Sequence, residues 1–196
     1  MPHRTVRLYV SEHARSRTRG PFPERPLPPT ADHPTRFVAD AMLGRLARWL
    51  RALGFDVVAD QGLDDDDLAR LARQQNRHLL TRDRRLCAER AHPGWCILLH
   101  THKPAAQLAE LDARIGIFST GWRERTFSRC MVCNTPLAPA THAEVRDDLP
   151  DDVRDDPRVR SAGFRRCPGC GRAYWEGSHT RRMRRWLERV ADRSEG

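Results

Sequence analysis

Four short apolar runs alternate with helical patterns between residues 36 and 118, and this alternation restricts the possible folds more than any other feature of the chain. The runs occupy residues 36–40, 55–60, 77–81 and 95–100. Strands that alternate with helices are typical of a parallel sheet with crossover helices. The runs lack an alternating polar pattern because both faces of such a sheet are covered. We therefore predict an α/β fold.

The helices that connect these strands are predicted at residues 41–55, 63–76, 82–91 and 103–115. Gly54 ends the first of them, and acidic residues fill the first turn of the second. The first helix is predicted to bury one face, made of Met42, Leu43, Leu46, Trp49, Leu50 and Leu53.

Composition bounds the rest of the interpretation. The 196 residues suffice for one ordinary domain, or for a domain with a small module. The net charge of +9 favours polyanionic partners, either nucleic acid or an acidic surface, and nearly all the basic residues are arginine, whose planar fork binds phosphate. No segment has the length of a membrane span and no signal-peptide core is seen, so we expect a cytoplasmic protein without a membrane partner.

Three parts are predicted along the chain. Residues 1–35 form an N-terminal arm with a proline-rich linker, since residues 19–34 contain six prolines. Residues 36–125 contain the alternating strands and helices. Residues 126–196 form a small cysteine-containing module and an amphipathic C-terminal helix, whose apolar stripe consists of Met183, Trp186, Leu187 and Val190.

Two Cys-x-x-Cys pairs point to a metal site in the last part. Cys130 and Cys133 form the first pair, and Cys167 and Cys170 the second. In a reducing compartment such pairs indicate metal binding, and two of them supply four thiolates to a tetrahedral Zn²⁺. The site would be closed and structural, with one zinc per chain. We expect Cys87 and Cys96, outside the pairs, to be ordinary core residues.

Acidic residues gather where the predicted strands end. Asp40 ends the first strand, and Asp83 follows the third by two residues. Ligands of an open parallel sheet bind beyond the carboxyl ends of its strands, so these acids are expected at one crevice. The second helix starts at the same edge, and either Asp65 or Asp66 could join them. Oxygen ligands of this kind select Mg²⁺ or Mn²⁺, which serve phosphodiester hydrolysis.

Each acid also has a structural explanation. Asp40 and Asp83 could cap the helices that follow them. Asp64 is the better cap of its own helix, with Asp67 completing a capping box. Asp60, after the second strand, is a weaker candidate for the crevice.

The motifs together resemble those of the Mut-seven C-terminal RNase domain family. The resemblance covers about residues 36 to 190 and rests on residues 37–58, on the acidic start "LDDDDL", on "LLTRDRRL", on the cysteine pairs and on "YWEGSHTRRM". It implies a PIN-like nuclease fold with a zinc ribbon, and Asp40, Asp65 and Asp83 as the acid cluster. The same resemblance implies Arg45, Arg48, Thr81 and Arg82 as supporting residues at the substrate.

Two functional hypotheses follow. The first is a metal-dependent ribonuclease, in which the acids hold Mg²⁺ or Mn²⁺ and arginines of the last helix, among them Arg181, Arg182 and Arg185, bind RNA phosphates. The candidate substrates include tRNA and other structured RNA. The second is a catalytically inactive zinc-ribbon protein that binds RNA or acts as an adaptor. The oligomeric state stays open.

Overall fold

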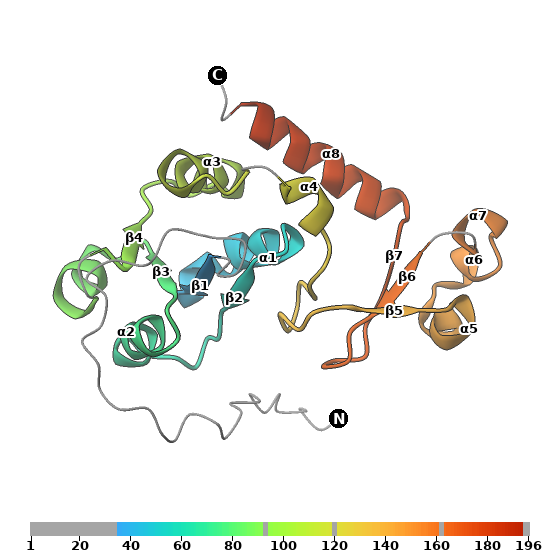
Figure 1. Ribbon diagram of the computed structural model, residues 1–196, viewed down its shortest axis with the longest axis horizontal. Coiled ribbons are helices and arrows are strands. Elements are labelled where there is room, and N and C mark those ends of the chain that lie inside the picture. Colours follow the sequence, from blue (N-terminus) through green and yellow to red (C-terminus); the bar gives the residue numbers. More distant parts are fainter. Residues whose placement is uncertain (1–34, 92–93, 119–120, 161–162, 194–196) are drawn as a thin grey trace.

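The computed structural model describes residues 35–91, 94–118, 121–160 and 163–193. In this part of the chain a four-stranded parallel sheet is followed by a three-stranded antiparallel sheet and a long C-terminal helix (Figure 1). This architecture confirms the predicted α/β fold with a second module. The predicted N-terminal arm lies, except for its last residue, outside the described residues.

The parallel sheet consists of β1 (Arg36–Ala39), β2 (Asp56–Val58), β3 (His78–Thr81) and β4 (Cys96–Leu98), in the order β2-β1-β3-β4. The chain moves from β1 outward to β2 and then crosses to β3 on the other side of β1. The strand order therefore reverses between β1 and β3. In open α/β sheets the crevice at such a reversal, beyond the carboxyl ends of the strands, is the usual ligand site.

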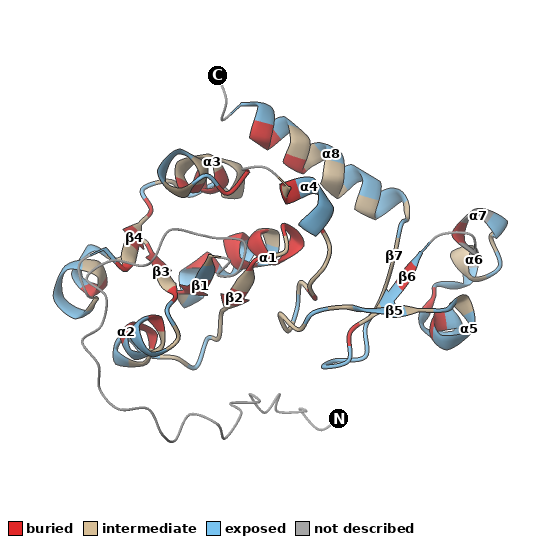
Figure 2. Cartoon of the chain, in the orientation of Figure 1, coloured by how far each residue is buried: buried red, intermediate tan, exposed pale blue. Residues whose placement is uncertain are grey.

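Helices cover both faces of this sheet because successive side chains of each strand point to opposite sides. Phe37 and Ala39 of β1 pack under α1 (Gly44–Ala52), α3 (Pro104–Ile115) and the C-terminal α8 (Ser178–Asp192). Val38 packs on the other face, against α2 (Asp65–Gln74) and the short π-helix η3 (Leu86–Arg90). Figure 2 shows the buried positions concentrated on the sheet and on the inner sides of these helices.

One residue of the predicted apolar face was assigned wrongly. Met42 is 55% exposed, whereas Leu43, Leu46, Leu50 and Leu53 are buried as predicted. The chain begins this helix with a turn of 3₁₀ helix, η2 (Ala41–Leu43), before α1 starts. The tighter winding of the 3₁₀ turn shifts the phase of the helical face, which turns Met42 toward solvent.

The second module is built around β5 (Ala138–Ala140), β6 (Phe164–Arg166) and β7 (Ala173–Trp175), which pair in that order. The acidic insert between β5 and β6 forms four short helices, which the sequence analysis did not predict: α5 (His142–Val145), η4 (Arg146–Asp148), α6 (Asp151–Arg154) and α7 (Pro157–Arg160). Val145, Leu149 and Val159 of the insert pack with Phe164 in a small core of their own.

The C-terminal helix returns to the first domain. Leu187, Val190 and Ala191 of α8 belong to the main core, and the rings of Trp186 and Trp49 stack with centroids 4.0 Å apart. The predicted apolar stripe of the helix is thus confirmed at three of its four positions. The short helix α4 (Trp122–Arg125), which leads into the second module, contributes Trp122 to the same core.

A buried arginine joins the two modules along the edge strand β2. Arg51, at the end of α1, donates to the carbonyl of Val57 from Nε (3.0 Å) and Nη2 (2.9 Å). Its Nη1 donates to the carbonyls of Met131 (3.3 Å) and Val132 (2.8 Å) in the first cysteine pair. The amide of Val57 donates in turn to Oδ1 of Asn134 at 3.0 Å. Both free backbone groups of Val57 at this sheet edge are thereby satisfied, as an edge strand requires.

We predict that Arg51→Met destabilises the protein by about 3 kcal/mol, because buried carbonyls on both sides of the junction lose their donor. Chemical denaturation of both variants would measure this loss. Arg48→Met, on the exposed side of the same helix, is the matched control and should change the unfolding free energy by about 0.5 kcal/mol or less. Equal effects of the two substitutions would contradict the role of Arg51 at the junction.

Candidate functional site

A threonine hydroxyl links two of the predicted acids at the reversal point of the sheet. Thr81, the last residue of β3, is fully buried. Its Oγ1 donates to Oδ2 of Asp40 at 2.7 Å and accepts from the amide of Asp83 at 2.9 Å. Asp40 follows β1 directly, and its own amide donates to the carbonyl of Leu80 at 3.0 Å. The ends of β1 and β3 are therefore joined by side-chain as well as backbone contacts.

Asp40 and Asp83 also cap the helical turns that follow them. Oδ1 of Asp40 accepts from the amide of Met42 at 3.4 Å. Oδ1 of Asp83 accepts from the amides of Arg85 (2.7 Å) and Leu86 (3.3 Å). The capping role and a position at the crevice are thus compatible. Among the described residues, no hydrogen bond occupies Oδ2 of Asp83.

The four consecutive acids at the start of α2 differ in the groups that they contact. Asp64 is the N-cap, and its Oδ1 accepts from the amide of Asp67 at 2.8 Å, as predicted. Asp67 pairs with Arg70, and Asp66 pairs with Arg90 of η3. Asp65 is exposed and has no partner within the described ranges, so its carboxylate is the one free to bind elsewhere.

Asp60, the weaker candidate, closes a turn: its Oδ1 accepts from the amide of Gly62 at 2.9 Å.

The three acids are not drawn together tightly. Among the described residues, the four cysteines form the only group of three or more potential ligands whose donor atoms all lie within 4.8 Å of one another. Asp40, Asp65 and Asp83 therefore do not meet this spacing. Thr81 joins Asp40 and Asp83 at the carboxyl-end edge of the sheet, whereas Asp65 lies at the start of α2.

The loop after β4 adds residues that the sequence analysis missed. Nη2 of Arg82 lies 2.8 Å from Nε2 of His102. Glu110 of α3 holds this loop, because its carboxylate accepts from the amide of His100 at 3.1 Å and from the hydroxyl of Thr101 at 3.2 Å. Glu110 thus stands in the second turn of α3, and its carboxylate is bonded to this loop and to Arg114.

The predicted phosphate-binding arginines are mostly exposed. Arg45 and Arg48 of α1 are exposed, and so are Arg181, Arg182 and Arg185 of α8. Arg181 makes one long contact, from Nη1 to the carbonyl of Glu176 at 3.5 Å. Arg184, on the same helix, pairs with Glu176 at 3.4 Å.

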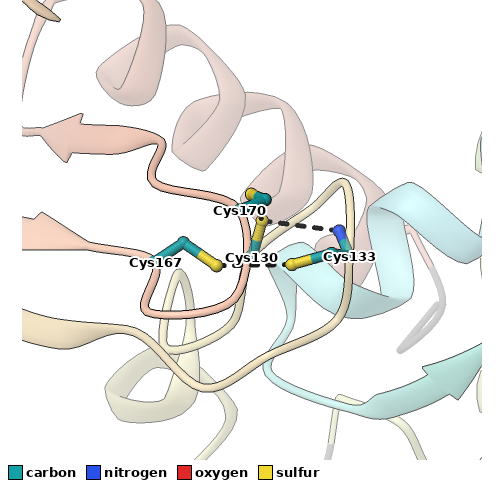
Figure 3. Close-up of side chains that lie close together, drawn as sticks. All are labelled: Cys130, Cys133, Cys167 and Cys170. Atoms are coloured by element: carbon teal, nitrogen blue, oxygen red, sulfur yellow. Dashed lines mark hydrogen bonds between the residues drawn. The ribbon is translucent and has the colours of Figure 1, made fainter. Parts of the chain in front are cut away.

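The four paired cysteines meet as predicted (Figure 3). Sγ of Cys133 lies 3.3 Å from Sγ of Cys167, and Sγ of Cys130 lies 3.6 Å from Sγ of Cys170. A tetrahedral Zn²⁺ with bonds of about 2.3 Å holds its sulfur atoms about 3.8 Å apart, so the cluster has the dimensions of a Cys₄ zinc site. The hydroxyl of Tyr174 lies 3.1 Å from Sγ of Cys130, in position to support that ligand.

The acidities of the thiols indicate why the cluster needs a cation. Burial opposes ionisation of Cys133, but hydrogen bonds from Thr135 outweigh it and lower the pKa of this thiol to about 6. Burial raises the pKa of Cys170 to about 12, and it also raises the pKa of Cys167. Ionisation is thus favoured at Cys133 and opposed at Cys167 and Cys170. Four thiolates can coexist here only when a metal ion neutralises them.

The prediction for the two remaining cysteines was wrong. Cys87 and Cys96 form a disulfide that connects η3 to β4. Neither is an isolated core residue, and both are only half-buried. The parallel sheet places β4 beside β3, and η3 begins five residues after β3 ends, so the two sulfur atoms meet on the sheet face covered by α2. Their separation in the sequence gave no sign of this pairing.

No helix in the described part of the chain is long and apolar enough to cross a membrane.

We predict that the purified protein contains one zinc ion per chain and that Cys167→Ser loses it, because structural zinc binding is coupled to folding. Elemental analysis gives the zinc content, and amide hydrogen exchange should become faster in β5, β6 and β7 of the variant. Cys87→Ser, which removes a cysteine outside the cluster, is the control and should retain the metal. A metal-free protein from zinc-replete medium would contradict the assignment.

The chain is similar to known proteins. The model of the Mut7-C RNAse domain matches residues 35–187. The human protein named exonuclease mut-7 homolog is 25% identical over an alignment that covers 76% of this chain and 25% of the relative, so the chain corresponds to about a quarter of that protein. No solved structure is significantly similar to the chain. Because the family model spans both the parallel sheet and the cysteine module, the chain belongs to the Mut7-C RNase domain family.

Proposed function

We propose that this protein is a metal-dependent ribonuclease in which Asp40, Asp65 and Asp83 hold Mg²⁺ or Mn²⁺. The observation that carries the proposal is the contact of Thr81 with Asp40 and Asp83 at the reversal point of a parallel sheet. Membership of an RNase domain family supports the reaction class. The human relative is named as an exonuclease.

The donor set suits a hard divalent cation. Asp65 has no partner in the described part of the chain, and Asp83 has one oxygen without a hydrogen bond there. Carboxylate oxygens are the ligands that Mg²⁺ and Mn²⁺ prefer, and their mutual repulsion is relieved by the ion. A bound ion of this kind supplies activation of water and stabilisation of the leaving oxygen in phosphodiester hydrolysis. Because the three acids are not within 4.8 Å of one another, substrate phosphate would complete the ligand set.

The side chains around the acids have separable roles. Thr81 is buried and bonds to Asp40, so it positions that carboxylate and leaves contact with phosphate to other residues. Arg45, Arg48 and Arg82 lie close in sequence to the acids and would bind the phosphates on either side of the cut. Arg181, Arg182 and Arg185 would bind more distant phosphates of the RNA, beside a zinc ribbon that is structural and RNA-binding.

An inactive RNA-binding or adaptor protein is the second candidate. One observation favours it: Asp40 and Asp83 already serve as caps, and the acids lack the spacing of a compact metal site. The two functions differ in their need for a divalent ion, since only the nuclease requires the acids for turnover.

We predict that Asp40→Asn and Asp83→Asn each reduce Mn²⁺-dependent RNA cleavage by about 100-fold or more, since each removes a charged ligand at nearly constant volume. Asparagine oxygens can still cap the following turns, so thermal unfolding should change little. Asp65→Asn should also lose activity. Asp66→Asn is its matched control, because Asp66 is the neighbouring exposed acid and pairs with Arg90. Wild-type turnover in Asp83→Asn at saturating Mn²⁺ would disprove the acid cluster.

The exposed arginines of α8 give a separate prediction. Binding to phosphates releases counterions, so RNA affinity should fall with salt at a slope of roughly −0.7 per contact for single strands. Replacing Arg181, Arg182 and Arg185 with glutamine should flatten the slope by about two, and it should do so equally for unrelated RNA sequences. Fluorescence anisotropy over a salt series measures this. An unchanged slope would move the RNA path to Arg45 and Arg48.

A further inference from the structure

A large cavity lies away from the acid edge, between the second module and α8. Its volume is about 770 Å³, which is within the range of small-molecule binding sites. The cavity is bounded by β6, β7, the insert helices, the first turns of α8 and the Thr126–Phe127 connection. None of Asp40, Asp65 and Asp83 lines it, so whatever it binds is separate from the proposed chemistry.

Aromatic and thioether side chains make up much of the wall. Phe127, Tyr174 and Trp175 line the cavity together with Met131 and Met183. These five residues are only half-buried, so packing leaves part of each side chain uncovered. In Figure 2 the strand β7 and the first half of α8 are coloured as intermediate or exposed, and the buried positions of this helix lie in its second half.

Phe127 is fixed in an unusual backbone conformation. Its φ is 60°, in the left-handed region that bulky side chains rarely occupy, and such strain is often retained at ligand sites. The amide of Phe127 donates to the carbonyl of Ala52 at 2.6 Å. The connection also lies so close to Gly54 that a Cβ at this glycine would stand 2.5 Å from the carbonyl oxygen of Arg125. The first domain thus holds Phe127 in place at the cavity wall.

Arginines surround this apolar surface. Arg165 and Arg181 line the cavity and are exposed, and Arg165 has no ion pair within the described ranges. Arg184 is shared between the carboxylate of Glu176 at 3.4 Å and the ring of Phe127, whose centroid lies 5.4 Å from the guanidinium carbon. Asp156 and Glu176 are the acids of the lining, so the arginines outnumber them.

We propose that this cavity binds a short stretch of single-stranded RNA, with bases stacked on Trp175 and Phe127 and phosphates on Arg165 and Arg181. The proposal rests on the proposed function in taking RNA as the ligand. Aromatic platforms flanked by basic side chains are how proteins bind single strands without sequence preference. A duplex would keep its bases paired and out of reach of the rings. The bound stretch lies apart from the crevice at Asp40 and Asp83, so the cavity retains part of the strand away from the cut.

The test uses the full chain carrying Asp83→Asn, so that RNA stays intact during binding. The probe is a fluorescein-labelled oligouridylate of about twelve nucleotides, within the usual site size of single-strand binders. Trp175→Leu should weaken its affinity by about fivefold or more. Arg165→Gln should flatten the salt slope by about 0.7, and because its side chain is exposed and unpaired it leaves the fold intact. Arg172→Gln is the matched control: Arg172 is an exposed arginine of the same module outside the cavity.

Photocrosslinking places the strand directly. In the Asp83→Asn chain without cavity substitutions, single-stranded oligonucleotides that contain 4-thiouridine should form adducts with Phe127, Tyr174 or Trp175. A double-stranded probe should form none of these adducts. The proposal would be overturned if Trp175→Leu and Arg165→Gln left the affinity and the salt slope unchanged and the adducts were confined to the outer face of α8. A peptide would then remain as the ligand class of the cavity.

Failure of this inference is distinguishable from failure of the proposed function. Mn²⁺-dependent cleavage by the chain with intact acids, together with cavity variants that bind like wild type, would refute the cavity site alone. Adducts in the cavity without any Mn²⁺-dependent cleavage would support the cavity site and refute the ribonuclease.

Discussion

The buried guanidinium of Arg51 is the contact on which the arrangement of the whole molecule depends. It is 6% exposed and donates to carbonyls on both sides of the boundary between the parallel sheet and the cysteine module. Burial lowers the pKa of Arg51, while the thiolates of Cys130 and Cys133 and the carboxylate of Asp56 favour its charged form. Asp56 is itself held ionised: burial opposes its charge, but the hydrogen bond and charge of Arg77 outweigh that cost and lower its pKa. The charge of Arg51, the cysteine cluster and the sheet edge are therefore mutually dependent.

This junction relates the two proposed sites to each other. Arg51 stands at the end of α1, whose other end follows Asp40 directly through η2. The same end of α1 holds Phe127 through Ala52 and Gly54. The helix α8, which lines the cavity with its first turns, packs its last turns on α1 and α3. The acid crevice and the aromatic cavity are thus attached to one helix, and their separation is set by well-packed structure on both sides of the boundary.

At the crevice, structure and chemistry use the same atoms. Asp40 and Asp83 stabilise the turns after β1 and β3 with one oxygen each, and the Thr81 hydroxyl takes the other oxygen of Asp40. A carboxylate held in this way cannot rotate freely, so it is pre-oriented for the cation proposed above. The loop after β4 is organised differently, because Glu110 binds its backbone and His102 contacts Arg82.

Local patterns in the sequence determined much of this structure. The apolar runs predicted all four parallel strands, the paired cysteines predicted the cluster, and the positions of Asp40 and Asp83 after their strands predicted the shared edge, because each depends on spacing along the chain. The tertiary structure alone decided the rest. The Cys87–Cys96 bond depends on the pairing of β3 with β4, which brings η3 beside β4. Arg51 contacts a carbonyl 81 residues away, and the apolar residues of the insert core stand among charges in the sequence. Met42 turned outward because a 3₁₀ turn changed the helical phase, and the ion pair with Arg90 of η3 engages Asp66 but not Asp65.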